Sequence, residues 1–550
     1  MRESIPFLSL YRQSNMAKIT VIVPSVALPI TAPVEEAYAA AAAQLRRRGA
    51  RPIQAQYRVY RRSVDARKQD IRFVYSVSVS GDFSVTDIDR LARAGIHPLA
   101  ADMPVLLRGK ETLAARPIVV GTGPAGLFAA MLLAENGYRP LVLERGGNVA
   151  ERVAATETFV KTRRLDTETN IQFGAGGAGT FSDGKLVTRV NDPLNGYVLS
   201  RLVDFGAPAE ITMLAKPHIG TDYLRTVVSR MLAYIEECGG EVCYHTALTD
   251  LRMDARGIIA AVTSQGEVIP CGTLVLAIGH SARDTYEMLL SRGLDIRPKP
   301  FSVGLRVEHL QEDIDRALYG KFAGHPALGH AEYALSDRTG ARGVYSFCMC
   351  PGGEVVAAAS EEGGVVVNGM SAHARDGRNA NAAIAVSIDT ADCGNTPAGA
   401  IAFQRGIERA AFAAGGADYS APLCLMSDFL AGREGGAPSR IRPTYMSGGV
   451  YLASPDRYLP AFVTSALRHA LPLFERRIAG YTAADVLLTG PETRTSAPVR
   501  IMRGDARTAT GVSNLYPCGE GAGYAGGITS AALDGIHTAM AICARYAPLM

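Results

Sequence analysis

A short apolar strand, residues 118–120, runs directly into three glycines, Gly121, Gly123 and Gly126, which have the spacing GxGxxG. In a strand-turn-helix unit the first glycine permits the tight turn, the second lets the backbone approach a pyrophosphate, and the third lets helix pack on strand. The phosphates then lie at the helix N-terminus, where free N–H groups and the helix dipole favour anions. The pattern therefore predicts a dinucleotide site on a parallel α/β sheet.

The residues after these glycines keep the same register. The predicted helix ends at the cap pair Asn136-Gly137, and a second strand, LVLE, ends at Glu144. Glu144 lies 18 residues after Gly126, near the offset of about 20 at which an acid bonds the ribose hydroxyls. This combination is more specific than a lone GxGxxG. The main alternative to a site for FAD is a site for NAD alone.

A second glycine cluster favours FAD over NAD. Residues 519–527 (GEGAGYAGG) follow an apolar strand and open the last helix, 393 residues after Gly126. A simple dehydrogenase would use the remaining strands of its sheet much sooner. A second helix N-terminus in the same cleft suits a flavin, because the flavin ring gains negative charge on reduction.

Three similar glycine patterns do not predict further nucleotide-binding sites. Glycines 521, 523 and 526 repeat GxGxxG without room for another βαβ unit, and glycines 174, 176 and 179 repeat it without a preceding strand. Residues 179–185 nearly form a P-loop, but Leu186 stands where a Ser or Thr must bind magnesium. Tight binding of a second nucleotide is therefore not expected, whereas NAD(P)H as a transient electron donor stays open.

Composition argues against several other classes. The net charge of +4, with 47% hydrophobic and 20% charged residues, describes a globular chain without a global field for nucleic acid or membrane. The odd number of nine scattered cysteines indicates reduced thiols in a cytoplasmic protein. No CxxC or HExxH run predicts a metal site. The apolar stretches 16–32 and 118–134 are broken by prolines or glycines, so no membrane span is expected.

Hydrophobic periodicity divides the chain into five segments and predicts an α/β fold. Residues 1–15 are expected to be a disordered leader, and residues 16–112 a small N-terminal α+β domain. A Rossmann-like FAD-binding domain, a parallel sheet plus a meander, is expected in 113–300 and again in 491–550. Residues 301–490 are predicted to be an inserted α+β substrate or cap domain.

The N-terminal domain carries a basic face. Ten arginines and lysines lie between Arg46 and Arg72, against only Asp65 and Asp70. A solvated surface is the favoured interpretation, because no aromatic-rich recognition motif accompanies the charge. Nucleic acid is therefore not an expected partner.

At this point the sequence resembles a family of incompletely characterised FAD-dependent dehydrogenases within the glutathione-reductase-like FAD/NAD(P)-binding superfamily. The resemblance covers most of residues 115–550 and is carried by VVGTGPAGLFAAMLLAENG, NIQFGAGGAGTFSDGKL, KPHIGTDYL, LAIGHSARDT, RGVYSFCMCPGG, ETRTSAPVRI and LYPCGEGAGYAGGITSAALDG.

The resemblance implies non-covalent FAD, with the adenosine half on residues 121–144 and the ribityl and ring half on residues 519–529. It also implies that Glu520, where many relatives have Asp, bonds the ribityl chain, that residues 277–279 give a backbone contact, and that residues 173–185 form a second flavin-covering loop. The cofactor-binding residues expected on these grounds are Gly121, Gly123, Pro124, Ala125, Gly126, Glu144, Arg145, Gly176, Gly177, Ala178, Gly179, Lys185, Ala247, Gly279, Gly519, Glu520, Gly526, Gly527, Ile528 and Thr529.

Three residues are candidates for catalysis. Cys348 and Cys350 would share one face of a strand and could line one pocket, although a disulfide is not expected because such positions lie about 6.6 to 7 Å apart at Cα. Packing of two small apolar side chains is the alternative. Lys185 would favour an anionic reduced flavin, or would pair with Asp183.

Further basic side chains could neutralise an anionic substrate or flavin. They are His280, Arg494 and Arg500, and each could equally satisfy buried backbone groups.

The function expected is transfer of a hydride between a small organic substrate and FAD. The sequence does not identify the electron donor or acceptor. The alternative hypothesis is a flavin-binding protein that its basic N-terminal domain recruits to RNA or to an acidic partner.

Overall fold

The computed structural model describes residues 16–67, 70–99 and 103–549. The leader expected at residues 1–15 lies outside these ranges. The chain forms two compact units. The first contains the described residues up to Met103 together with residues 209–217 and 318–329, and the second contains the other described residues. Among the described residues no helix is both long and apolar enough to cross a membrane.

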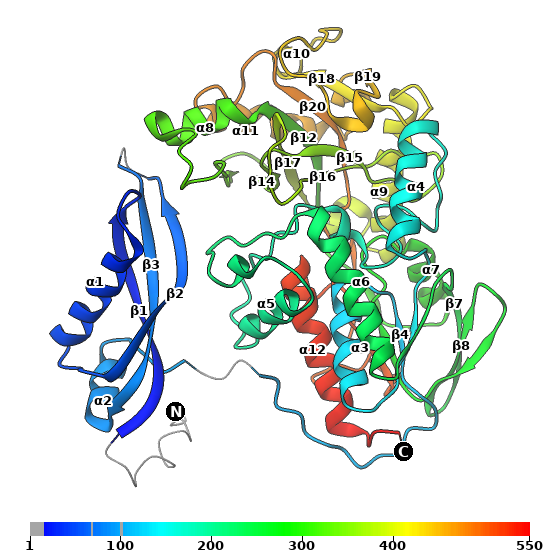
Figure 1. Ribbon diagram of the computed structural model, residues 1–550. Helices are drawn as coiled ribbons and strands as arrows, with labels where there is room; N and C mark the ends of the chain where they lie inside the picture. Colours follow the sequence, from blue (N-terminus) through cyan, green and yellow to red (C-terminus); the bar gives the residue numbers. More distant parts are fainter. Residues whose placement is uncertain (1–15, 68–69, 100–102, 550) are drawn as a thin grey trace. The chain divides into compact units, whose positions relative to one another are not determined.

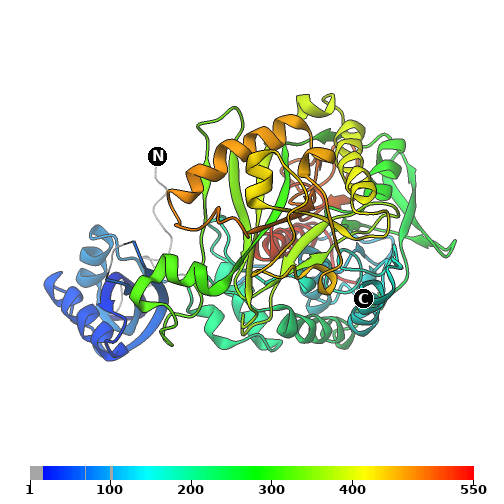
Figure 2. The same cartoon turned by 90° about the horizontal axis from the view of Figure 1, so that it is seen from above.

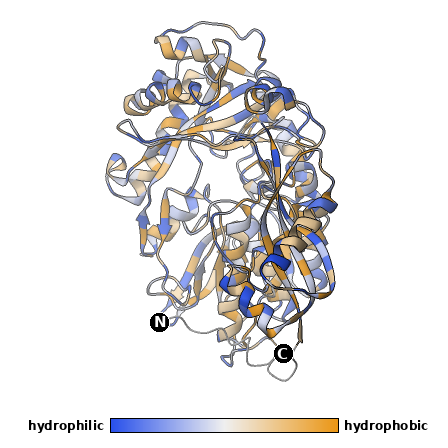
Figure 3. Cartoon of the chain, turned by 90° about the vertical axis from the view of Figure 1, so that its left-hand side faces the viewer, coloured by the Kyte–Doolittle hydropathy of each residue, from blue (hydrophilic) through white to orange (hydrophobic). Residues whose placement is uncertain are grey.

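The first unit is built on a three-stranded antiparallel sheet of order β1-β3-β2. Its elements are β1 (Met16–Pro29), α1 (Val34–Arg47), β2 (Ile53–Asp65), β3 (Arg72–Ser84) and α2 (Val85–Arg93). Buried residues alternate along β3, the central strand, and Figure 3 shows hydrophobic and hydrophilic residues interspersed along the strands. The elements of this unit thus follow the order strand-helix-strand-strand-helix, as an α+β domain.

Two later segments also belong to this unit, which corrects the predicted domain boundaries. Residues 209–217 contribute Ala215, whose amide donates to the carbonyl of Arg62 at 2.9 Å. Residues 318–329 contribute Tyr319 and Phe322 to the apolar core of the unit. Residues 104–112 belong instead to the second unit, where the Gly109 amide donates to the Cys543 carbonyl at 2.7 Å.

The second unit contains a five-stranded parallel sheet of order β22-β10-β4-β5-β6 (Figure 1). The strands are β4 (Ile118–Val120), β5 (Leu141–Leu143), β6 (Glu241–Cys243), β10 (Leu274–Leu276) and β22 (Leu515–Pro517). An antiparallel meander of β7 (Leu248–Asp254), β8 (Gly257–Thr263) and β9 (Val268–Pro270) lies between β6 and β10 in the chain. The structure thus has the expected parallel sheet with a meander.

Two helices that follow strands of this sheet are packed together. α3 (Pro124–Glu135) contacts β4, β10, α6 (Thr221–Glu237) and α12 (Ile528–Arg545). Residues 125–134 of α3 are all buried, which explains why this helix is apolar on every side. Figure 2 shows α12, in red, running through the interior of the unit.

The same unit contains a seven-stranded, mainly antiparallel sheet of order β13-β14-β17-β12-β20-β18-β19. Its central strand, β12 (Phe301–Leu310), is buried along its whole length. The other strands are β13 (Ser336–Asp337), β14 (Val344–Cys350), β17 (Asn379–Ile388), β18 (Ala421–Leu425), β19 (Val450–Leu452) and β20 (Leu487–Glu492).

Shorter strand pairs and further helices complete the second unit. The pairs are β11 (Ile296–Pro298) with β21 (Val499–Ile501) and β15 (Glu354–Ala357) with β16 (Val367–Met370). The helices are α4 (Val149–Thr162), α5 (Asn195–Asp204), α7 (Arg283–Ser291), α9 (Pro397–Ala414), α10 (Met426–Ala431) and α11 (Ala461–Glu475). α8 (Gln311–Tyr319) leads from this unit into the 318–329 segment of the first.

Candidate functional site

A cavity of about 320 Å³ lies within the second unit. The residues that follow β4, β5, β6, β10 and β22 all contribute to its lining, as do residues of the seven-stranded sheet. Open α/β sheets bind ligands at the carboxyl ends of their strands, and a cavity of this size is in the range of small-molecule sites.

The three glycines after β4 have different surroundings, as the fingerprint predicts. Gly121 has a φ of +94°, and a Cβ there would lie 2.4 Å from the carbonyl oxygen of Ala277. A Cβ on Gly126 would lie 1.9 Å from the carbonyl oxygen of Gly121. At Gly123, by contrast, a Cβ would meet no atom within 4 Å. The first and third glycines therefore allow close packing, and the second leaves space for a ligand.

Two helices begin at this cavity without a side-chain cap. α3 begins after Gly123, and α12 begins after Gly527, which has a φ of +112° and open space at its Cβ position. Uncapped helix N-termini attract anions through their free N–H groups and dipoles. A dinucleotide pyrophosphate at α3 and an electron-rich ring at α12 would both fit this arrangement.

Glu144 lines the cavity, but its carboxylate is turned toward the surrounding loops. It accepts hydrogen bonds from the amide and hydroxyl of Thr122 and from the amides of Gly146 and Gly174, each amide at 3.0 Å. A carboxylate has about four acceptor positions, so the contacts within the chain occupy them. The contact between Glu144 and a ribose stays a prediction.

Lys185 also lines the cavity, and the ion pair that was the alternative for it is present. Its Nζ lies 3.0 Å from Asp183 and 3.4 Å from Glu332. Burial opposes the charge of Lys185, but the two carboxylates outweigh it and raise the pKa of this lysine. Asp183 is fully buried and also pairs with Arg375 at 2.5 Å. Lys185 is therefore a charged, anchored group at the cavity wall.

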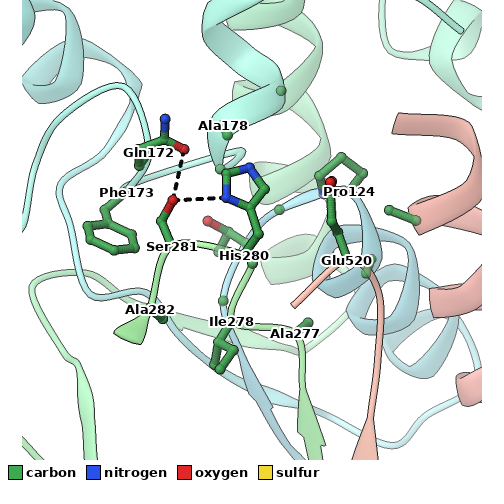
Figure 4. A pocket seen from close by; sticks show the side chains of 18 of the residues that line it. Pro124, Gln172, Phe173, Ala178, Ala277, Ile278, His280, Ser281, Ala282 and Glu520 are labelled. Atoms are coloured by element: carbon green, nitrogen blue, oxygen red, sulfur yellow. Dashed lines mark hydrogen bonds between the residues drawn. The ribbon is translucent and has the colours of Figure 1, made fainter. Parts of the chain in front are cut away.

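A chain of hydrogen bonds determines which ring nitrogen of His280 carries the proton (Figure 4). Gln172 donates from Nε2 to the Ala358 carbonyl at 3.3 Å, so its Oε1 accepts from the Ser281 hydroxyl at 3.2 Å. Because the hydroxyl proton of Ser281 is donated to Gln172, the Ser281 oxygen accepts a hydrogen bond from Nδ1 of His280 at 2.9 Å. Burial, assisted by Arg494, lowers the pKa of His280 to about 3. His280 is therefore neutral, and its Nε2 is a hydrogen-bond acceptor at the cavity.

Glu520 lines the cavity between the two uncapped helices. Burial raises the pKa of its carboxyl to about 7, although the Gly527 amide and the charge of Lys299 act in the opposite direction. A buried carboxyl with this pKa can donate a hydrogen bond when protonated.

Most of the residues expected at the cofactor do line the cavity. They are Gly121, Gly123, Pro124, Ala125, Glu144, Arg145, Gly177, Ala178, Gly179, Lys185, Ala247, Gly279, Glu520, Gly526, Gly527 and Ile528, and the candidate Cys348 joins them.

Other expected residues do not belong to the lining and have packing roles. Gly126 packs helix on strand, and Gly176 has a Cβ position only 2.1 Å from Thr180 Oγ1. Gly519 donates to Asp534 at 2.7 Å, and Thr529 donates to the Leu186 carbonyl at 2.8 Å. Cys350 is completely buried behind Cys348. A glycine motif does not reveal which of its members face the ligand, which is why the prediction included them.

The basic residues considered for an anionic ligand have carboxylate or carbonyl partners. Arg494 lines the cavity but pairs with the buried Glu408 at 3.0 Å. Arg500 donates to the Gly523 carbonyl at 3.2 Å. Their charges are thus largely engaged within the protein.

Sequence reasoning missed several residues of the cavity wall that lie outside the glycine motifs. Phe347 and Glu492 line the cavity from the seven-stranded sheet, Asn368 from β16, and Thr495 from the residues just after β20. Glu492 and Thr495 belong to the recognised ETRTSAPVRI stretch, which was the available signal, whereas nothing local marks Asn368.

Comparison with known proteins places this architecture in a class. Residues 119–181 match the NAD(P)-binding Rossmann-like domain, and residues 300–495 match the family described as FAD-dependent protein, C-terminal domain-like. Residues 22–80 match a domain of unknown function. The fold and the site thus define an FAD-dependent, oxidoreductase-like flavoprotein whose cofactor is FAD.

An uncharacterized protein of Clostridium beijerinckii is 45% identical to this chain over 493 residues, which are 89% of this chain and 92% of the clostridial one. The chain belongs to the same family of incompletely characterised FAD-dependent proteins.

Solved structures resemble the chain only distantly. The structure of CtdE in complex with FAD is 11% identical, with a TM-score of 0.32, over 79% of this chain and 84% of that one. A triple mutant of the flavin-dependent brominase Bmp2 is 12% identical, with a TM-score of 0.37, over 78% of this chain and 79% of that one.

Proposed function

We propose that the protein is an FAD-dependent oxidoreductase that transfers a hydride between a small organic substrate and non-covalently bound FAD. The observation that supports this proposal most directly is the continuity of the cavity. Its lining runs from the glycine turn at Gly123, past the start of α12 at Ile528, to Cys348 on the seven-stranded sheet and Thr495 just after β20. One continuous space therefore joins the dinucleotide turn to a region where a second, smaller molecule could bind.

FAD supplies the hydride chemistry when it is bound, and the chain supplies binding, orientation and charge. The α12 N-terminus would stabilise negative charge that develops beside it. The neutral His280 would accept a hydrogen bond through Nε2, and Glu520 would donate one in its protonated form. Lys185 would remain charged, because Asp183 and Glu332 hold its proton.

The electron partner is proposed to be a small molecule that visits the cavity. NAD(P)H is one such donor, and its use would be transient.

An anaerobic reduction screen on the purified full-length chain tests this proposal. The protein should be yellow, should release FAD on denaturation, and should lose its flavin absorbance with at least one organic donor or with NAD(P)H. RNA should not be required for the reaction. A colourless protein from which no FAD can be released, and which takes up none, would overturn the proposal.

A further inference from the structure

The part of the cavity wall formed by β14 contains two cysteines, and the side chain of the second contacts the backbone of the first. Cys348 lines the cavity, and Cys350 is fully buried immediately behind it. The thiol of Cys350 lies 3.4 Å from the carbonyl oxygen of Cys348. One thiol is therefore open to a molecule in the cavity, and the other is shielded from it.

A β-bulge lies at these two cysteines. The pairing of β14 with β17 is regular up to Phe347 and shifts before Cys350, and Cys348 has a φ of +45°. A non-glycine residue rarely adopts that backbone conformation, and bulges re-aim side chains next to functional sites. The Cα separation expected for a regular strand does not apply here, because the chain is not extended at Cys348. The structure thus removes the reason for excluding a bond between these cysteines.

A fully buried arginine holds the bulge in place. Arg306 donates to the Cys348 carbonyl at 2.8 Å, and its Nη1 lies 4.0 Å from the sulfur of Cys350. Its remaining donors bind Glu492, Asn368 and Asn381. All five N–H donors of the guanidinium therefore have partners, and a fixed positive charge lies beside the thiol pair.

This environment favours the thiolate of Cys348. The hydrogen bond from Cys350 lowers the pKa of Cys348, and Arg306 and Lys185 act in the same direction, against burial and the charge of Asp183. The pKa of Cys350 is raised, so Cys350 keeps its proton. Burial raises the pKa of Cys424 to about 12, as it does for a thiol that only fills space. The alternative interpretation, that Cys348 only fills space as a small apolar side chain, does not explain why Arg306 and Lys185 lie near it.

We propose that Cys348 and Cys350 form a redox-active dithiol-disulfide couple that exchanges two electrons with the FAD of this cavity. On oxidation the S–H bond of Cys350 breaks, and one S–S bond forms between its sulfur and the thiolate sulfur of Cys348. Two electrons and one proton pass to the oxidised flavin, which becomes its anionic reduced form, and the reverse step reduces the disulfide. Cys348 is the sulfur that meets molecules in the cavity, and Cys350 is the internal partner. This inference deepens the proposed function and rests on it.

A reductive titration of the FAD-loaded, full-length chain tests the couple. After oxidation with oxidised glutathione and its removal, the wild type should consume about twice as many reducing equivalents from dithionite as the Cys348→Ser or Cys350→Ser variant. Cys238→Ser is the matched control, because Cys238 is a half-exposed thiol at the end of α6, and it should titrate like the wild type. Equal consumption by the wild type and both serine variants would overturn the inference.

Mass spectrometry after thiol alkylation gives a second readout that does not need catalytic turnover. Oxidation should protect Cys348 and Cys350 together and lower the mass of their peptide by two hydrogens, and neither change should occur in a serine variant. In the reduced protein Cys348 should be alkylated faster than Cys243 at about pH 7, because the pKa of Cys348 is lowered and that of Cys243 is raised by burial and by Glu241. If donors reduce the flavin but both thiols stay alkylatable after oxidation of the protein, the couple alone would be overturned. A chain that takes up no FAD would overturn the proposed function as well.

Discussion

At the scale of single residues, Gly123 is a position where a side chain should weaken cofactor binding without disturbing the fold. Its φ of −62° suits any residue, and a side chain there would enter open space. We expect Gly123→Val to reduce FAD affinity at least about 100-fold, with less than about 1 kcal/mol change in the free energy of unfolding. Released FAD per chain and urea unfolding measure the two effects.

Gly121→Val is the control for this prediction. Its φ of +94° and the carbonyl of Ala277 2.4 Å from the new Cβ oppose any side chain. We expect this variant to lose about 3 kcal/mol or more of stability. A Gly123→Val protein that binds FAD as tightly as the wild type would contradict the assignment of the space at Gly123 to the cofactor.

Glu520 should make stability depend on pH. Its pKa of about 7 lies above its ordinary value of 4.5, so the folded chain binds this proton more tightly than the unfolded chain. Its contribution to stability is full below about pH 4.5 and is lost as the pH rises through about 7. Glu520→Gln mimics the protonated form and should raise the free energy of unfolding of the FAD-free chain by about 2 kcal/mol at about pH 8.

The Glu520→Gln advantage should vanish at about pH 4.5 in the same urea titrations. Glu408→Gln is the comparison, because it would remove a carboxylate that pairs with the buried Arg283 and Arg494 and whose pKa lies well below its ordinary value. That variant should be destabilised at about pH 8. A destabilised Glu520→Gln protein at this pH would show that Glu520 is ionised and needed as a carboxylate.

At the scale of helices and strands, one buried carboxylate joins three elements. Glu408 on α9 accepts from Arg283 at the start of α7, and from Thr493 and Arg494 just after β20. Despite burial, the two arginines hold the pKa of Glu408 well below its ordinary value. Glu408→Gln should cost about 3 to 5 kcal/mol, because it leaves two buried cations with insufficient compensation.

The exposed ion pair of Glu287 with Arg405, at 3.1 Å, provides the control for Glu408. Glu287→Gln should change the free energy of unfolding by less than about 1 kcal/mol. Chemical denaturation of the two variants at neutral pH makes the comparison, and equal effects would contradict the role given to Glu408.

The elements themselves were largely predictable, and their long-range pairing was not. The strand before Gly121, the helix after it and the last helix follow from local periodicity and glycine spacing. The bulge at Cys348 does not, since it depends on pairing with β17 and on Arg306 from β12. The same holds for the order of the seven-stranded sheet, because strands far apart in the sequence meet in it. Local patterns cannot carry that information.

At the scale of the whole molecule, the first unit depends on chain segments that come much later. Tyr319, Phe322 and Leu328 pack against its apolar core. A fragment of residues 16–103 should therefore unfold at lower urea concentration than the same fragment with residues 318–329 joined by a flexible linker. Circular dichroism during urea titration measures the difference. A linked segment of scrambled sequence is the control, and equal midpoints for all three would contradict this dependence.

The order of the parallel sheet also affects how the protein can be made. β10 (Leu274–Leu276) lies between β4 and β22, and β22 begins only at Leu515. While the chain is being synthesised, one edge of β10 therefore has no partner strand until the long segment between β10 and β22, and β22 itself, have left the ribosome. An unpaired apolar strand edge invites association with other chains. Yield in a cell should therefore depend on chaperones that shield this edge during translation.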